Sequence, residues 1–202
     1  MTNVVSVRGS AAVLRECICA GGVAVFPTDT VYGLCCDPTD PGAVARLYEL
    51  KGRAADKPAA LLCFSLDAAL AVLGELGERT RSALRVLLPG PVTVLLANDE
   101  RRFPLAGGEL LGLRVVDIGV VLELAVLQTS ANRAGEPDAC RLGDVPSQIR
   151  QRADLVIDGG ELPGVPSTVV DLSRLEIDSS WRVVRQGALD ERALARALGT
   201  IA

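Results

Sequence analysis

The chain has 202 residues, a formal net charge of −4 and no histidine, and 49% of its residues are hydrophobic although only 3% are aromatic. This length favours a single domain over residues 1–202 with a sizeable aliphatic core. The absence of histidine excludes Ser-His-Asp and Cys-His hydrolases and histidine-ligated metal enzymes. The negative net charge disfavours a protein that coats nucleic acid.

The sequence contains no apolar run of about 18 residues, the length that crosses a bilayer. Its first residues also lack the basic and then apolar pattern that is typical of secreted proteins. We therefore expect a cytoplasmic protein. Its six cysteines form no CxxC pair, so we interpret them as reduced, small hydrophobic residues rather than as zinc ligands.

Apolar periodicity and Gly/Pro punctuation predict the following elements in chain order. A helix over residues 11–20 precedes a strand over 23–26, a helix over 42–50, a strand over 60–64 and helices over 68–73 and 80–88. Strands follow over 92–97, 111–116, 122–129 (which could begin as helix), 155–158, 168–172 and 181–185, and a helix over 190–198 closes the chain. Because strands and helices mix without a strict βαβ rhythm, we predict an α/β fold with a mixed sheet.

The segment Phe-Pro-Thr-Asp-Thr-Val-Tyr-Gly-Leu, residues 26–34, follows the first predicted strand. It combines hydroxyls, a carboxylate and a phenol in a strand-to-loop transition, where α/β proteins place ligands. The alternative is an ordinary turn in which Thr28 and Asp29 bond the local backbone.

The only two lysines, Lys51 and Lys57, lie with Arg53 in one short stretch, against nineteen arginines in the whole chain. Three cations so close together at the end of a predicted helix could clamp a triphosphate. The alternative is a solvated helix end, where cations interact favourably with the helix dipole. No Walker A loop or GxGxxG segment is present.

Two further segments carry polar groups at or in predicted strands. Arg114 lies inside an apolar strand, so its charge must be paired or face a cavity, and a contact with a substrate carboxylate is our hypothesis. The run Thr129-Ser130-Ala131-Asn132 ends another strand with two hydroxyls and an amide, although such a run could also be a strand-to-turn cap.

Together and in this order, eight segments resemble the YrdC-like family of threonylcarbamoyl-adenylate synthases in its short, single-domain form. They are PTDTVYGL at 27–34, KGRAADKP at 51–58, PGPVTVLL at 89–96, LGLR at 111–114, TSAN at 129–132, GEP at 135–137, PSTVVD at 166–171 and RQG at 185–187. Each segment alone is a weak signal, whereas the ordered set covers nearly the whole chain.

The resemblance implies a twisted mixed sheet around a concave basic cavity. It also implies synthesis of threonylcarbamoyl-AMP and pyrophosphate from L-threonine, bicarbonate and ATP, with Mg²⁺ brought largely by the ATP phosphates. The product would pass to a threonylcarbamoyl-transferase that modifies tRNA to N6-threonylcarbamoyladenosine. We expect weak or no direct RNA binding and no membrane partner.

The resemblance also assigns roles to individual residues. The catalytic set around the nucleotide comprises Lys51, Arg53, Ser130 and Asn132. L-Threonine would be bound by Thr30, Arg114 and Ser167, with Arg114 on its carboxylate. ATP would contact the catalytic set together with Lys57, Thr93 and Arg185.

The sequence departs from the family pattern at three places. The stretch from Arg114 to Thr129 is short, Cys140 stands where a threonine is common, and Leu62 stands roughly where some members have a histidine. These departures leave open a non-catalytic YrdC-like paralogue that binds nucleotide or RNA. A carbamoyltransferase or hydrogenase-maturation role is disfavoured, because there the module is fused to others.

Overall fold

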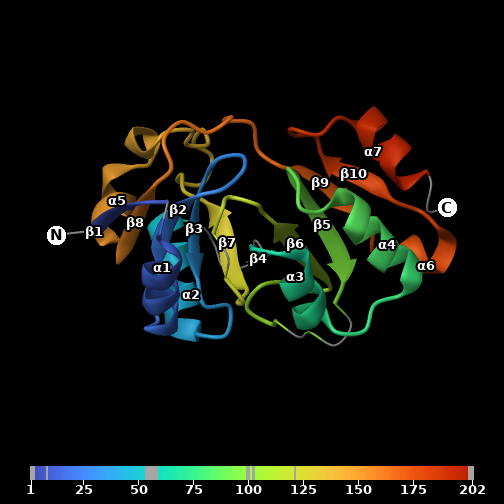
Figure 1. Ribbon diagram of the computed structural model, residues 1–202, viewed down its shortest axis with the longest axis horizontal. Helices are drawn as coiled ribbons and strands as arrows, with labels where there is room; N and C mark the ends of the chain where they lie inside the picture. The colour runs from blue at the N-terminus through green and yellow to red at the C-terminus, as the bar shows by residue number, and fades with distance from the viewer. Residues whose placement is uncertain are drawn as a thin grey trace.

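The computed structural model describes residues 3–7, 9–52, 59–98, 101, 103–120 and 122–199. These residues form a ten-stranded sheet with strand order β1-β8-β2-β3-β7-β4-β6-β5-β9-β10, so that β1 and β10 lie at opposite ends (Figure 1). The strands are β1 (Asn3–Ser6), β2 (Ala24–Pro27), β3 (Tyr32–Cys36), β4 (Ala60–Cys63), β5 (Val92–Ala97), β6 (Leu110–Val115), β7 (Val126–Ser130), β8 (Leu155–Asp158), β9 (Thr168–Asp171) and β10 (Arg182–Arg185).

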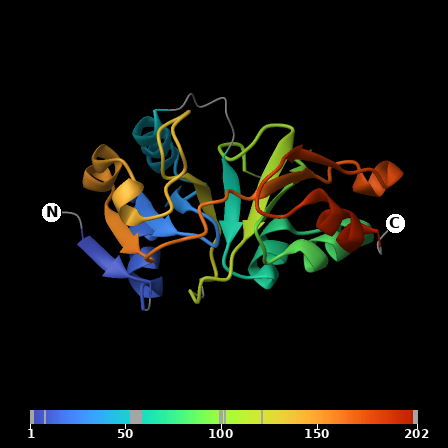
Figure 2. The ribbon, with the colours of Figure 1, turned by 90° about the horizontal axis from the view of Figure 1, so that it is seen from above.

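The sheet is mixed, as predicted. Four strand pairs run parallel (β1/β8, β2/β8, β4/β6 and β5/β9), and the others run antiparallel. The segment 159–167 joins β8, near one end of the sheet, to β9, near the other, and therefore crosses the molecule (Figure 2).

The helices are α1 (Ala11–Cys19), α2 (Pro41–Lys51), α3 (Leu66–Leu73), α4 (Glu78–Leu87), α5 (Ser147–Arg152), α6 (Leu175–Asp178) and α7 (Glu191–Leu198), with a 3-10 turn at Leu142–Asp144. None of the helices in the described ranges combines the length and the apolar character needed to cross a membrane. All six cysteines are free thiols, and Cys35, Cys36 and Cys63 are buried in the core.

The two faces of the central strands differ in character because side chains alternate along a strand. Leu61, Val94, Leu113 and Leu127 point to one face, where they join the main core with residues of α2 to α7. The intervening positions on β4 to β7 include small and polar side chains, such as Ala60, Thr93, Gly112, Arg114 and Gln128. A smaller core on that second face unites α1 with β2 and β8.

Most predicted elements are present within one or two residues, but several differ. Strand β3 begins at Tyr32, inside the segment interpreted as a loop, and β1, α5 and α6 were not predicted. Of the predicted strand 122–129, only the part from Val126 is extended, and residues 122–125 form neither helix nor strand. Lys51 is the last residue of α2 rather than a residue beyond it.

Candidate active site

A cavity of about 310 Å³ lies on the face of the central strands that carries the small and polar side chains. Small residues line the part of the cavity over β4 and β6, because Ala60 and Gly112 are register partners on these strands. A Cβ atom on Gly112 would come within 3.2 Å of the Ala60 Cβ and within 3.7 Å of Leu95 Cδ2. Gly112 therefore lines the cavity with backbone, and a larger residue there would crowd Ala60.

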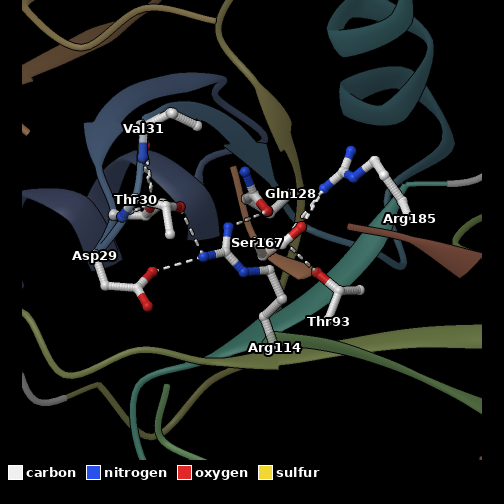
Figure 3. Close-up of polar contacts among 9 residues, drawn as sticks. Asp29, Thr30, Val31, Thr93, Arg114, Gln128, Ser167 and Arg185 are labelled. Carbon is white, nitrogen blue, oxygen red and sulfur yellow. Dashed lines mark hydrogen bonds and ion pairs between the residues drawn. The ribbon is translucent and has the colours of Figure 1, made fainter. Parts of the chain in front are cut away.

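The three residues assigned to threonine by sequence, Thr30, Arg114 and Ser167, all line this cavity. They come from the turn after β2, from β6 and from the residue before β9, and Figure 3 shows them close together. Segments that lie far apart in the chain thus converge, as the resemblance implies.

Arg114 is the buried cation of the cavity, with an exposed fraction of 4%. Its Nη2 donates to Asp29 Oδ1 at 2.6 Å and to Thr30 Oγ1 at 3.0 Å, and its Nη1 donates to Gln128 Oε1 at 3.5 Å. Burial lowers the pKa of Arg114, the Asp29 carboxylate acts in the opposite direction, and the nearby charge of Arg185 lowers this pKa further. The charge of Arg114 is thus both paired with a carboxylate and located at a cavity, as expected for a charge in an apolar strand.

The turn that presents Thr30 and Asp29 is ordered by the hydroxyl of Thr28. Thr28 Oγ1 donates to Val31 O at 2.7 Å and accepts from the N–H groups of Thr30 and Val31 at 3.2 and 3.3 Å. Thr28 thus bonds local backbone, as the ordinary-turn interpretation suggested, but Asp29 turns away to pair with Arg114.

A second polar group at the cavity wall contains Ser167, Thr93 and Arg185. The hydroxyls of Thr93 and Ser167 lie 2.7 Å apart, and Arg185 Nη2 donates to the Ser167 carbonyl at 2.7 Å (Figure 3). Gly187 allows this approach, since a Cβ there would lie 2.3 Å from Pro166 O. Thr93 and Arg185, assigned to ATP by sequence, therefore adjoin the residue assigned to threonine.

Lys51, Ser130 and Asn132 form one hydrogen-bonded cluster, as the resemblance implies. Lys51 Nζ donates to Ser130 O and Oγ at 2.7 and 3.0 Å and to Asn132 O and Oδ1 at 3.2 and 2.6 Å. Ser130 also donates from Oγ to Asn132 Oδ1 at 2.7 Å. Ser130 lines the cavity, whereas Lys51 is 4% exposed and lies behind it.

Local structure explains why Lys51 reaches this position. Asp40 caps the start of α2 by accepting from the backbone N–H groups of Gly42 and Ala43. Gly52, with a φ of 61°, ends the helix directly after Lys51. The backbone N–H of Ala134 then donates to Lys51 O at 3.1 Å, which ties the loop after Asn132 to the helix end.

Arg53 and Lys57, which the resemblance assigns to the site, lie outside the described residues, so their roles stay predictions. Sequence reasoning missed three other polar residues of the site: Asp29, Gln128 and Asp138. Gln128 and Asp138 line the cavity, and Asp29 bonds to Arg114. The sequence does show a carboxylate next to Thr30. It does not show that this carboxylate pairs with Arg114, which lies 85 residues further along the chain.

The structure also locates the residues at which the sequence departs from the family pattern. Cys140 Sγ donates to Asp144 Oδ2 at 3.2 Å, whereas Leu62 is fully buried in the smaller core beside Val126. In the segment between β6 and β7, the described residues 116–120 and 122–125 contain neither helix nor strand.

Comparisons with known proteins show the family and the fold of the chain. The profile of the Sua5–YciO–YrdC family, described as telomere recombination, matches residues 16–187. The threonylcarbamoyl-AMP synthase of Pyrococcus abyssi is 31% identical over 96% of this chain and 58% of its own length. The Chromohalobacter salexigens synthase is 37% identical over 75% of this chain and 86% of its own.

The solved structure of P. abyssi Sua5 complexed with L-threonine superimposes with a TM-score of 0.84 at 27% identity, covering 98% of this chain and 61% of that one. The chain thus spans about three fifths of the length of its P. abyssi relative. With a family profile that matches most of its residues, the chain belongs to the Sua5–YciO–YrdC family.

Proposed function

We propose that the chain is a threonylcarbamoyl-AMP synthase, a nucleotidyltransferase that uses L-threonine, bicarbonate and ATP and releases pyrophosphate. The observation that carries the proposal is the convergence of Thr30, Arg114 and Ser167 on the same cavity as Ser130, which is bonded to Lys51 and Asn132. The names of the relatives and the threonine complex of P. abyssi Sua5 support the substrate.

Arg114 is suited to the α-carboxylate of threonine. A guanidinium binds carboxylates through directed N–H groups, and the interaction is strong where water is excluded. The Nε atom of Arg114 is buried and has no hydrogen-bond partner among the described residues. Since a buried donor without a partner is unfavourable, a ligand carboxylate at Arg114 would offset that cost.

The reaction itself needs no protein nucleophile and no histidine. The threonine nitrogen attacks CO₂ with loss of a proton, or bicarbonate with loss of water, to form a carbamate. A carbamate oxygen then attacks the α-phosphorus of ATP, with pyrophosphate as the leaving group. Charge accumulates on phosphate oxygens, so the protein contributes positioning and electrostatic stabilisation. We assign this role to Lys51, Ser130 and Asn132, and to Arg53, with Lys57, Thr93 and Arg185 nearby on the ATP.

Mg²⁺ accompanies ATP in this proposal, because it binds phosphate oxygens and water in preference to protein cages. Among the described residues, no group of three or more His, Cys, Asp and Glu side chains is arranged to hold a metal ion. The mechanism therefore assigns no protein ligand to the metal and no step to it. The product would pass to a transferase that acts on tRNA.

Pyrophosphate release by the purified chain tests the proposal. We expect release from ATP only when L-threonine and bicarbonate are both present, because the carbamate is the group that attacks the α-phosphorus. Release that is equally fast without threonine, or ATP binding with no release under any condition, would contradict it and favour the non-catalytic paralogue.

A further inference from the structure

The charge of Arg114 is balanced by one carboxylate, which lies outside the wall of the cavity. Asp29 is not among the cavity-lining residues, yet its Oδ1 lies 2.6 Å from Arg114 Nη2. The side chains of the two residues are 5% and 19% exposed, so water screens this pair little. It therefore differs from the surface ion pairs of the chain, such as that between Arg152 and Glu49.

The hydrogen bonds of Arg114 are unevenly distributed over its three nitrogens. Nη2 donates both to Asp29 and to Thr30, which accounts for its two hydrogens. Nη1 has one long contact with Gln128 at 3.5 Å, and Nε has no partner in the described part of the chain. Asp29 and Thr30 thus take both hydrogens of Nη2, whereas one hydrogen of Nη1 and the Nε–H have no partner in the described part of the chain (Figure 3).

Asp29 is itself held in place. The turn from Thr28 to Val31 is closed by three hydrogen bonds to or from the Thr28 hydroxyl, and Thr28 is 2% exposed. Burial raises the pKa of Asp29, while the Arg114 guanidinium acts in the opposite direction. A rigid turn therefore directs a poorly solvated carboxylate at Arg114.

The charged groups at or beside the cavity include Arg114, Arg185, Asp29 and Asp138. Arg185 lies close enough to lower the pKa of Arg114, so two positive charges adjoin the cavity wall beside Ser167. Asp29 pairs with Arg114, and the carboxylate of Asp138 also lies in the cavity lining, so the two arginines are matched by two carboxylates. Without Asp29 the guanidinium of Arg114 would lose its strongest partner and its fixed orientation.

We propose, on the basis of the function above, that Asp29 is a positioning residue for the amino acid substrate. It holds Nη2 of Arg114 so that the remaining N–H groups of the guanidinium meet the substrate carboxylate in a fixed orientation. Asp29 contributes to threonine binding through Arg114 and makes no contribution to ATP binding.

The test compares Asp29→Asn, Asp29→Ala, Arg114→Ala and the double variant Asp29→Ala/Arg114→Ala by pyrophosphate release. Asp29→Asn raises the KM for L-threonine about tenfold or more, and Asp29→Ala raises it further, because asparagine keeps one acceptor oxygen. The KM for ATP changes less than about twofold. In the Arg114→Ala background, Asp29→Ala adds nothing, since the partner through which it acts is absent.

The control is Glu49→Gln, which removes an exposed carboxylate from the 2.7 Å ion pair with Arg152, a distance close to the 2.6 Å between Asp29 and Arg114. We expect both KM values to be unchanged. Thermal unfolding of each variant by circular dichroism reports on the fold. If Asp29→Ala does not fold, the closely isosteric Asp29→Asn still allows the comparison. Equal rises in both KM values, or independent effects of Asp29→Ala and Arg114→Ala, would overturn the proposal.

Calorimetric titration of L-threonine separates this inference from the function on which it rests. Wild-type protein that does not bind L-threonine would overturn both. Wild-type protein that binds it, with Asp29→Asn binding equally or more tightly, would overturn the role of Asp29 alone. Equal binding would mean that the Asp29 carboxylate contributes nothing to threonine binding, and tighter binding would mean that it repels or competes with the substrate.

Discussion

Lys51 connects a helix end to the polar end of β7. Its ammonium group donates to backbone and side-chain oxygens of Ser130 and Asn132 at 2.6–3.2 Å while its side chain is buried. An arginine would not fit these contacts, since its planar fork is larger than a compact ammonium group. This gives a physical reason for one of only two lysines in an arginine-rich chain.

Replacement of this lysine is therefore expected to affect both catalysis and stability. Lys51→Ala lowers kcat for pyrophosphate release by about 100-fold or more, because it removes a positive charge and releases Ser130 and Asn132. It also lowers the free energy of unfolding by about 1–3 kcal/mol, because buried acceptors lose their donor. Urea unfolding and initial rates measure the two effects.

Arg46→Ala is the matched control, since Arg46 lies on the same helix in an exposed ion pair with Asp154. This variant is expected to change the free energy of unfolding by less than about 1 kcal/mol and to leave kcat unaltered. Lys51→Ala with wild-type kcat would refute the catalytic assignment.

At the level of elements, the segment from β9 to β10 forms the wall of the cavity that carries Ser167 and Arg185. Thr168 is fully buried, and its hydroxyl donates to Leu189 O and accepts from the N–H groups of Gly187 and Leu189. This clamp holds the chain after β10 against the start of β9.

Gly187→Ala is expected to disturb this wall. Its Cβ would lie 2.3–2.6 Å from backbone atoms of Pro166 and Ser167, so that strand β9 or the loop must shift. We expect a loss of about 1–3 kcal/mol in the free energy of unfolding and a higher KM for ATP. Gly143→Ala, where a Cβ meets nothing within 4 Å, is the control. Equal stability of the two variants would contradict the close-packing argument.

Strands β9 and β10 are also joined by Asp171 and Arg182, which are register partners. Burial opposes ionisation of Asp171, but hydrogen bonds from Ser173 and Arg182 outweigh it and lower its pKa. A lowered pKa in the folded state stabilises the protein above about pH 4, and this stabilisation is lost as the pH falls through the folded-state pKa.

Asp171→Asn should therefore cost about 1 kcal/mol in the free energy of unfolding at pH 7 and less at pH 3. Urea unfolding of wild type and variant at both pH values gives the difference. A cost that does not depend on pH would show that the charge of Asp171 contributes nothing.

At the scale of the whole molecule, sequence patterns predicted the mixed sheet, most of its strands and the site role of Arg114, whereas the family resemblance supplied Thr30 and Ser167. Arg114 could be found because a charge in an apolar strand must have a buried partner or a ligand. Asp29 could not be identified as that partner, since the pairing depends on β2 and β6 being brought together across β3, β7 and β4.

The elements that were missed have local causes. Strand β3 continues directly from a turn whose Thr and Asp residues are typical of loops. Strand β1 is short, and its apolar residues pair with β8, more than 150 positions away. Residues 122–125 have irregular backbone, and the side chain of Leu122 packs in the smaller core. An apolar residue that is buried from irregular backbone gives the same sequence pattern as one in a strand.

The central claim is that the chain joins threonine, bicarbonate and the adenylyl group of ATP into one product. Mass spectrometry of the reaction with ¹³C-bicarbonate tests it most directly. We expect a threonylcarbamoyl-AMP ion that gains a single mass unit from the labelled carbon and that is absent when threonine is omitted. An adenylate without the labelled carbon, or no adenylate from folded protein that binds both ATP and threonine, would contradict it.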